Sequence, residues 1–200
     1  MNEENIKLSE NIIIADADYI DKVAFDLIVN FERMIGRRIP PADLSQWVVN
    51  IALDGGLREN RKAHETQVVL IHSKKNSQFE NFSPSNYEKD INAKAFKDEK
   101  LGEFIVNSYE VDEAIGSKDQ YILDLINTTC SHEEVKRIML IPNVEEGDLY
   151  DHIIHALRNV DEDKHVTVFA MQPMMGGNFK QEILGFSLMN AMGIKADEIK

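Results

Sequence analysis

The sequence predicts a single α/β domain with a three-layer, Rossmann-like arrangement and a mostly parallel five-stranded sheet. Short apolar runs alternate along the chain with segments whose apolar residues recur every three or four positions, as in amphipathic helices. The runs are continuously apolar instead of alternating with polar residues, which is typical of strands buried on both faces. Because crossovers between parallel strands are right-handed, we expect helices on both faces of the sheet. The length of 200 residues, 43% of them hydrophobic, is enough for one substantial core.

The elements follow in chain order. The first predicted strand, residues 12–16, leads into a long amphipathic helix that extends to Gly36. Pro40-Pro41 then opens a second helix that ends near Gly55. Four more strands are predicted at residues 67–72, 103–109, 136–141 and 165–170, and four more helices at residues 85–96, 118–129, 146–157 and 178–192.

Composition and the chain ends narrow the functional classes. The chain has 22 Lys plus Arg and 35 Asp plus Glu, a formal net charge of −13, so its overall field repels phosphate backbones. Residues 1–10 form a polar tail unlike a signal peptide, and residues 11–200 form the domain. The single Cys130 fits a reducing compartment, and no run approaches the ~18 apolar residues of a membrane span. These features predict a cytoplasmic protein with no membrane partner.

Acidic residues follow the first strand, in "NIIIADADYID". In parallel sheets, the loops after the strand carboxyl ends share one edge, where ligands bind. We therefore expect Asp16 and Asp18 to lie near the loop "PNVEEGD", residues 142–148, where carboxylates can hold Mg²⁺ or Mn²⁺. The alternative is that Asp18 caps the long helix and Asp21 favours its positive end. That alternative leaves Asp16, at the strand tip, unexplained.

The order of elements resembles that of the PIN-like nucleases, in particular the NYN branch. "IIIADAD" resembles their first strand with its Asp, "SKDQYILDLI" their Asp-bearing helix, and "KRIMLIPNVEEGDLYDHIIHAL" stands where their acidic loop belongs. The resemblance implies a ribonuclease that uses Mg²⁺ or Mn²⁺ to cleave single-stranded RNA. The catalytic residues would be Asp16, Asp124, Glu146 and Asp148, and the candidate metal ligands Asp16, Asp18, Asp119, Asp124, Glu146 and Asp148.

This chain departs from the PIN-like pattern in the acidic loop. Asn143 and Glu145-Glu146 replace the acids and small residues expected there. A degenerate relative that does not cleave RNA is therefore the alternative within the same family. No motif indicates an organic cofactor.

The stretch "DAD" also resembles the Asp-x-Asp signature of the haloacid-dehalogenase-like phosphatases. That resemblance implies Asp16 as nucleophile, Asp18 as general acid/base and a magnesium ion, with Ser73 and the acids Glu146 and Asp148 completing the set. Tyr19-Ile20 stand where that family usually has Gly-Thr or Thr-Val.

A third hypothesis is a non-catalytic protein-interaction domain. Five of the eight methionines lie in the closing segment, and methionine is favoured at adaptable binding surfaces as well as in cores. They predict a homodimer through this segment, made by Met171, Met174, Met175, Met189 and Met192. The whole chain also resembles an uncharacterised family of gut Bacteroidetes proteins.

Overall fold

The computed structural model describes residues 8–60, 62 and 64–199. Residues 1–7 of the expected polar tail lie outside the described residues. Ser9, within the same expected tail, is buried, and its backbone N–H donates to the side chain of Gln67. The expected tail therefore includes at least one residue that packs against the sheet.

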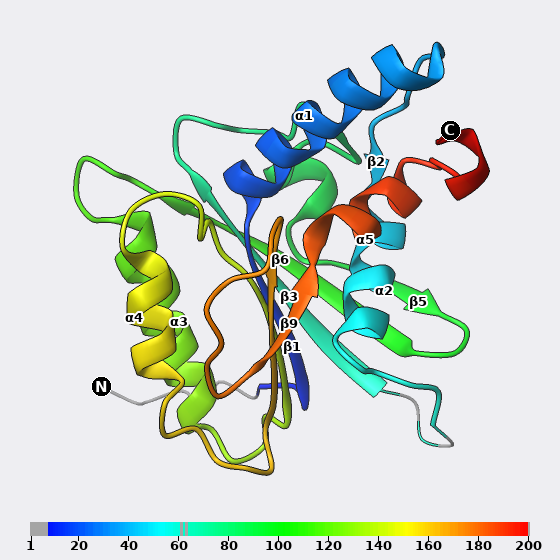
Figure 1. Cartoon of the computed structure of the whole chain (residues 1–200). Coiled ribbons are helices and arrows are strands. Elements are labelled where there is room, and N and C mark those ends of the chain that lie inside the picture. Colours follow the sequence, from blue (N-terminus) through cyan, green and yellow to red (C-terminus); the bar gives the residue numbers. More distant parts are fainter. Residues whose placement is uncertain (1–7, 61, 63, 200) are drawn as a thin grey trace.

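One seven-stranded sheet runs through the molecule in the order β5-β6-β3-β1-β7-β8-β9 (Figure 1). All neighbouring pairs are parallel except β5 and β6. The strands are β1 (Asn11–Asp16), β3 (His64–Ser73), β5 (Lys94–Asp98), β6 (Gly102–Val111), β7 (Arg137–Ile141), β8 (His165–Ala170) and β9 (Lys180–Ile183). The five predicted strands are confirmed, and they occupy the five central places.

The expected count of five strands is wrong, because β5 and β9 add one strand at each edge. Both arise where a helix was expected. In 85–96 the structure has η1 (Tyr87–Ile91), a single π-helical turn, followed by β5; in 178–192 it has β9 and then the shorter α5 (Leu184–Ala191). The edge strands are half exposed and carry charges, so they lack the continuous apolar run of the central strands.

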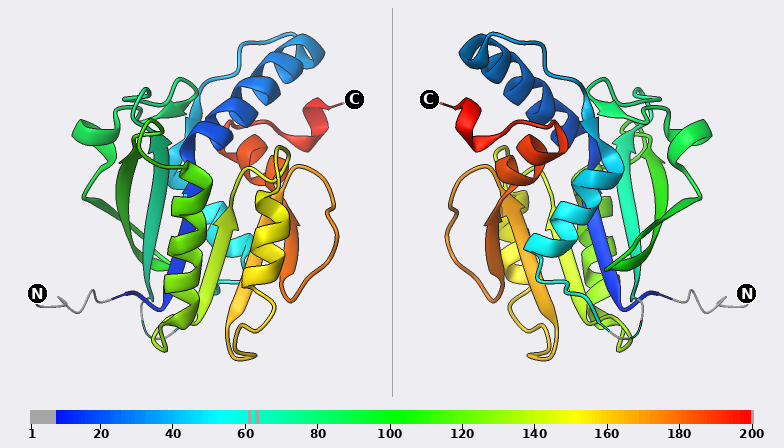
Figure 2. Two further views of the ribbon diagram at one scale, coloured as in Figure 1. Left: turned by 90° about the vertical axis from the view of Figure 1, so that its left-hand side faces the viewer. Right: turned by 90° about the vertical axis from the view of Figure 1, so that its right-hand side faces the viewer.

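Helices cover both faces of the sheet, as expected. Figure 2 shows α3 (Lys118–Ser131) and α4 (Leu149–Ala156) over one face, and α2 (Leu44–Asp54) and α5 over the other. The helix α1 (Ala17–Ile35) packs with α2 and α5 in one hydrophobic core, and α3 and α4 enclose a second core. A short ladder of β2 (Ala42–Asp43) and β4 (Phe82–Ser83) joins the α1–α2 connection to the segment after β3.

The chain closes with η2 (Ala196–Glu198), a short 3₁₀ turn beside the end of α1 (Figure 1). The Arg37 guanidinium donates two hydrogen bonds to the Glu198 carboxylate, at 2.7 and 2.9 Å. None of the helices in the described part of the chain has the length and apolar character that crossing a bilayer requires.

Candidate functional site

Asp16 caps α1. It is the last residue of β1, and its Oδ1 accepts a hydrogen bond from the backbone N–H of Tyr19 at 3.1 Å. The expectation that Asp18 caps this helix is therefore wrong. The helix begins at Ala17, directly after the strand, so the capping position falls on the final strand residue. This explains why a carboxylate stands at the strand tip.

Asp18 and Asp21 hold the segment that follows β3. Asp18 accepts hydrogen bonds from the backbone N–H of Ser73 at 2.8 Å and from the Asn76 side chain at 2.7 Å. One helical turn later, Asp21 accepts from the backbone N–H groups of Glu80 and Asn81, at 3.0 and 2.8 Å. Through these hydrogen bonds, the two acids hold residues 73–81 against the first turns of α1.

A lysine that the sequence analysis did not select completes the cluster. The Nζ atom of Lys118 lies 2.8 Å from Oδ1 of Asp16 and 2.7 Å from Oδ2 of Asp18. The side chains are 14% exposed in Lys118, 2% in Asp16 and 20% in Asp18. Lys118 is the first residue of α3, whose N-cap is Ser117. We call Asp16, Asp18 and Lys118 the ion-paired triad.

The sequence held one signal for this lysine. Lys118 opens the helix that connects β6 to β7, so its first turn lies at the edge of the sheet where the parallel strands, β1 among them, end. A positive charge at that place has two nearby carboxylates to neutralise.

The pKa values in the triad follow from burial and from this contact. Burial raises the pKa of Asp16, against the opposing effect of the Lys118 charge. Burial also acts to raise the pKa of Asp18, but hydrogen bonds from Lys118 and Asn76 outweigh it and leave this pKa below its usual value. Burial acts to lower the pKa of Lys118, and the two carboxylates more than compensate, so its pKa is raised. The lysine is therefore charged at neutral pH.

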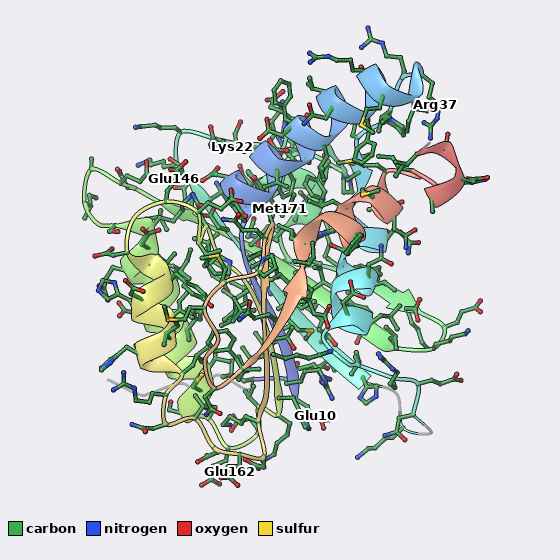
Figure 3. All side chains as sticks on the ribbon, viewed as in Figure 1. Glu10, Lys22, Arg37, Glu146, Glu162 and Met171 are labelled. Atoms are coloured by element: carbon green, nitrogen blue, oxygen red, sulfur yellow. The ribbon has the colours of Figure 1, made fainter. Side chains whose placement is uncertain are left out.

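The other predicted ligands and catalytic acids have different partners. Asp119 follows Lys118 in the first turn of α3 and is half-buried, whereas Asp124 is exposed and accepts a hydrogen bond from Gln120. Glu146 pairs with Lys22 on α1 at 3.3 Å, both side chains being exposed, and the two are labelled side by side in Figure 3. Asp148 precedes α4, and its Oδ1 lies 3.9 Å from Nδ1 of His152. Across the described residues, no three His, Cys, Asp or Glu side chains are grouped so that they could hold a metal ion.

The loop after β7 approaches α1 at Tyr19. The Tyr19 hydroxyl is buried, with no hydrogen-bond partner within the described ranges. Burial raises the pKa of Tyr19, and the negative charges of Glu145 and Asp16 add to the effect. This loop therefore brings Glu145, which was not among the predicted site residues, close enough to act electrostatically on the start of α1.

A polar cavity of about 390 Å³ adjoins the triad. Its lining includes Asp18, Asp21, Lys75, Asn76, Gln78 and Tyr87. Asp18 and Asp21 accept hydrogen bonds from the segment 73–81 at this wall.

The closing methionines are mostly packed inward. Met192 is buried in the core with α1, α2 and α5, while Met171 and Met189 pack against that core and Met174 against the other. Met175 alone of the five is largely exposed. Core packing accounts for most of this cluster, and the homodimer through it stays a prediction.

The role of Asp21 gives a first testable prediction. Replacing Asp21 by asparagine removes one of two acceptors for the Glu80 and Asn81 amides, so we expect unfolding free energy to fall by about 1–2 kcal/mol. Urea unfolding measures the loss, and amide hydrogen exchange at residues 80 and 81 locates it. Asp26→Asn, at an exposed position on the same helix, is the matched control and should leave both unchanged. Equal effects of the two variants would contradict the assignment.

Comparison with known proteins assigns the chain to a family. A model of a family of unknown function, DUF6621, matches residues 5–199. No curated protein and no solved structure matched the chain. Because the family match covers nearly the whole chain, the protein belongs to this family.

Proposed function

We propose that this member of DUF6621 is a Rossmann-like, PIN-like binding domain that does not cleave RNA. The observation that carries the proposal is the position of the Lys118 ammonium, within hydrogen-bond distance of both Asp16 and Asp18. A divalent cation between these carboxylates would have to displace an ammonium already paired with both. Two positive centres at one place repel each other, so the lysine opposes metal binding there.

The placement of the remaining acids supports the same proposal. Metal-assisted phosphodiester hydrolysis needs several oxygen ligands that converge on the ion and on the attacking water. Asp124 is turned to Gln120, and Glu146 to Lys22, so neither of these acids is held toward Asp16. The net charge of −13 also disfavours a polyanionic substrate.

Incubation with single-stranded RNA and Mn²⁺ tests the proposal. We expect no cleavage above the rate given by the Asp16→Asn variant, and no rise in the melting temperature on adding Mg²⁺ or Mn²⁺. Metal-dependent cleavage that disappears in Asp16→Asn would overturn the proposal and establish the nuclease.

A phosphatase is the second candidate function, and the contact of Ser73 with Asp18, one of the acids with which it was grouped, supports it. The Ser73 backbone N–H donates to Asp18 at 2.8 Å, at the edge where Asp16 ends β1. This candidate requires Mg²⁺-dependent hydrolysis of para-nitrophenyl phosphate by the intact protein and its loss in Asp16→Asn. Equal rates in the two proteins would rule it out.

A further inference from the structure

A second cavity lies at the same edge of the sheet, at the ends of β3 and β6. It has a volume of about 420 Å³, within the ~300–1,000 Å³ range of small-molecule sites. Its lining includes His72, Asn86, Tyr87, Asn92, Ser108 and Glu110. Tyr87 also lines the cavity beside the triad, so the two cavities share a wall. The triad residues are not part of this lining.

His72 presents an unused lone pair to this cavity. The residue is only 5% exposed, and its ring stacks on Tyr87 with 3.9 Å between centroids. Its Nδ1 lies 3.0 Å from the carbonyl oxygen of Ser73, which can only accept, so Nδ1 carries the proton. In the neutral ring, Nε2 is then an acceptor, and in the part of the chain that the structure describes no donor reaches it. The Nε2 atom at the cavity wall can therefore accept a hydrogen bond from a ligand.

Glu110 supplies a second acceptor on the same side of the sheet. In the parallel pairing of β3 and β6, Glu110 is directly opposite His72, and Ser108 is opposite Leu70. Residues paired in this way point to the same face, so the carboxylate and the imidazole line one wall.

Two side-chain amides supply donors. Oδ1 of Asn86 accepts from the backbone N–H of Lys89 at 2.9 Å, and Oδ1 of Asn92 accepts from the backbone N–H of Ser108 at 3.1 Å. These contacts fix the amide oxygens and leave the NH₂ groups of Asn86 and Asn92 without a partner among the described residues. The cavity therefore offers both donors and acceptors.

We propose that this cavity binds an uncharged, polyhydroxylated small molecule of the size of a monosaccharide. Hydroxyl groups both donate and accept, so they can satisfy His72 and Glu110 as well as the two amides. A cation would leave the amide donors unpaired. An anion would meet the carboxylates of Glu88 and Glu110, which outnumber the single ammonium of Lys89 in the lining. A flat aromatic ligand cannot stack on the Tyr87 face that His72 already covers.

The aromatic side chains behind the cavity hold it in place. Phe79 contacts both Tyr87 and Phe82, with ring centroids 4.8 and 4.7 Å apart, and Phe82 contacts Trp47 of α2 edge-on. The wall formed by Tyr87 and His72 is thus continuous with the core, which favours a preformed site over one ordered by its ligand.

Ligand-observed NMR and calorimetry with D-glucose, D-galactose, D-mannose and myo-inositol test this inference. We expect saturable binding of at least one of these at about millimolar dissociation constant or tighter. His72→Ala and Glu110→Gln should each weaken it about tenfold or more, while His155→Ala, at an exposed position on α4, should not. Glu110 is exposed, so its variant reports on binding even if His72→Ala is poorly folded.

Three outcomes would overturn the inference. They are no binding of any of the four compounds up to about 50 mM, binding that persists in both cavity variants, and preferential binding of inorganic phosphate or putrescine at His72. The RNA-cleavage test involves none of these probes or variants, so the two proposals can fail separately.

Discussion

Lys118→Ala is expected to lower the free energy of unfolding by about 3 kcal/mol. The substitution leaves Asp16, which is 2% exposed, and the partly exposed Asp18 without their shared counter-ion. Removing one partner of a buried ion pair costs ~3–5 kcal/mol, because an uncompensated charge stays behind. The exposed part of Asp18 places the expected loss at the lower end of that range. Urea unfolding followed by circular dichroism measures it.

Lys22→Ala is the matched control for this experiment. Lys22 also pairs with a carboxylate at the same end of the sheet, Glu146, but both side chains are exposed. Exposed pairs contribute ~0–1 kcal/mol, so little stability should be lost. Equal losses in Lys22→Ala and Lys118→Ala would show that the triad contributes no more than a surface pair.

Deprotonation of Lys118 is expected to lower the free energy of unfolding at alkaline pH. Its pKa in the folded protein is raised above the usual 10.5, mainly because the Asp16 and Asp18 carboxylates overcome the opposing effect of burial. The folded state then binds the proton more tightly than the unfolded state. The contribution is fully present below about pH 10.5 and is lost as the pH rises through the folded pKa. The difference in stability between the wild type and Lys118→Ala should therefore shrink as the pH rises above about 10.5. A difference that stays constant from about pH 9 to pH 12 would contradict the prediction.

Trp47→Ala is expected to cost about 3–5 kcal/mol of unfolding free energy. Trp47 is fully buried on α2 and packs edge-on against Phe82, with ring centroids 5.7 Å apart. Truncating it leaves a cavity in the core formed by α1, α2 and α5, at the point where the segment after β3 meets that core. Circular dichroism during urea unfolding measures the loss.

Phe186→Ala tests whether this cost comes from burial. Phe186 is an aromatic residue on the neighbouring helix α5 and is largely exposed, so its truncation should change stability by less than about 0.5 kcal/mol. Trp47→Phe, which keeps an aromatic ring at the site, should recover a good part of the alanine loss. A loss at Trp47 no greater than that at Phe186 would be inconsistent with the packing described.

The central sheet could be predicted from the sequence because its strands are buried on both faces. Such strands are largely apolar, and residues 12–15 of β1 and 138–141 of β7 appear in the sequence as uninterrupted apolar runs. The same reasoning does not predict β5 and β9. They are held by one neighbouring strand each, and their partly exposed residues alternate too little to distinguish a strand from a helix.

The candidate site was predicted in part. The edge on which Asp16, Asp18 and Ser73 meet follows from strand order alone. The roles of these acids depended on side-chain direction, which the spacing of residues did not fix. The capping role passed from Asp18 to Asp16 because α1 starts without a connecting residue. The contact of Lys118 with Asp16 was not predicted, because the two residues are over 100 positions apart in the chain and no local sequence pattern connects them.

The edge strands β5 and β9 affect how readily the sheet can pair with another copy of the chain. A sheet edge exposes N–H and C=O groups that can pair with another chain and begin aggregation. β5 has five residues, including Lys94 and Lys97, and β9 has four, including Lys180 and Glu182. Short, charged edges of this kind resist edge-to-edge pairing. The two strands that were hardest to recognise therefore protect the long apolar strands between them from fibril-like growth.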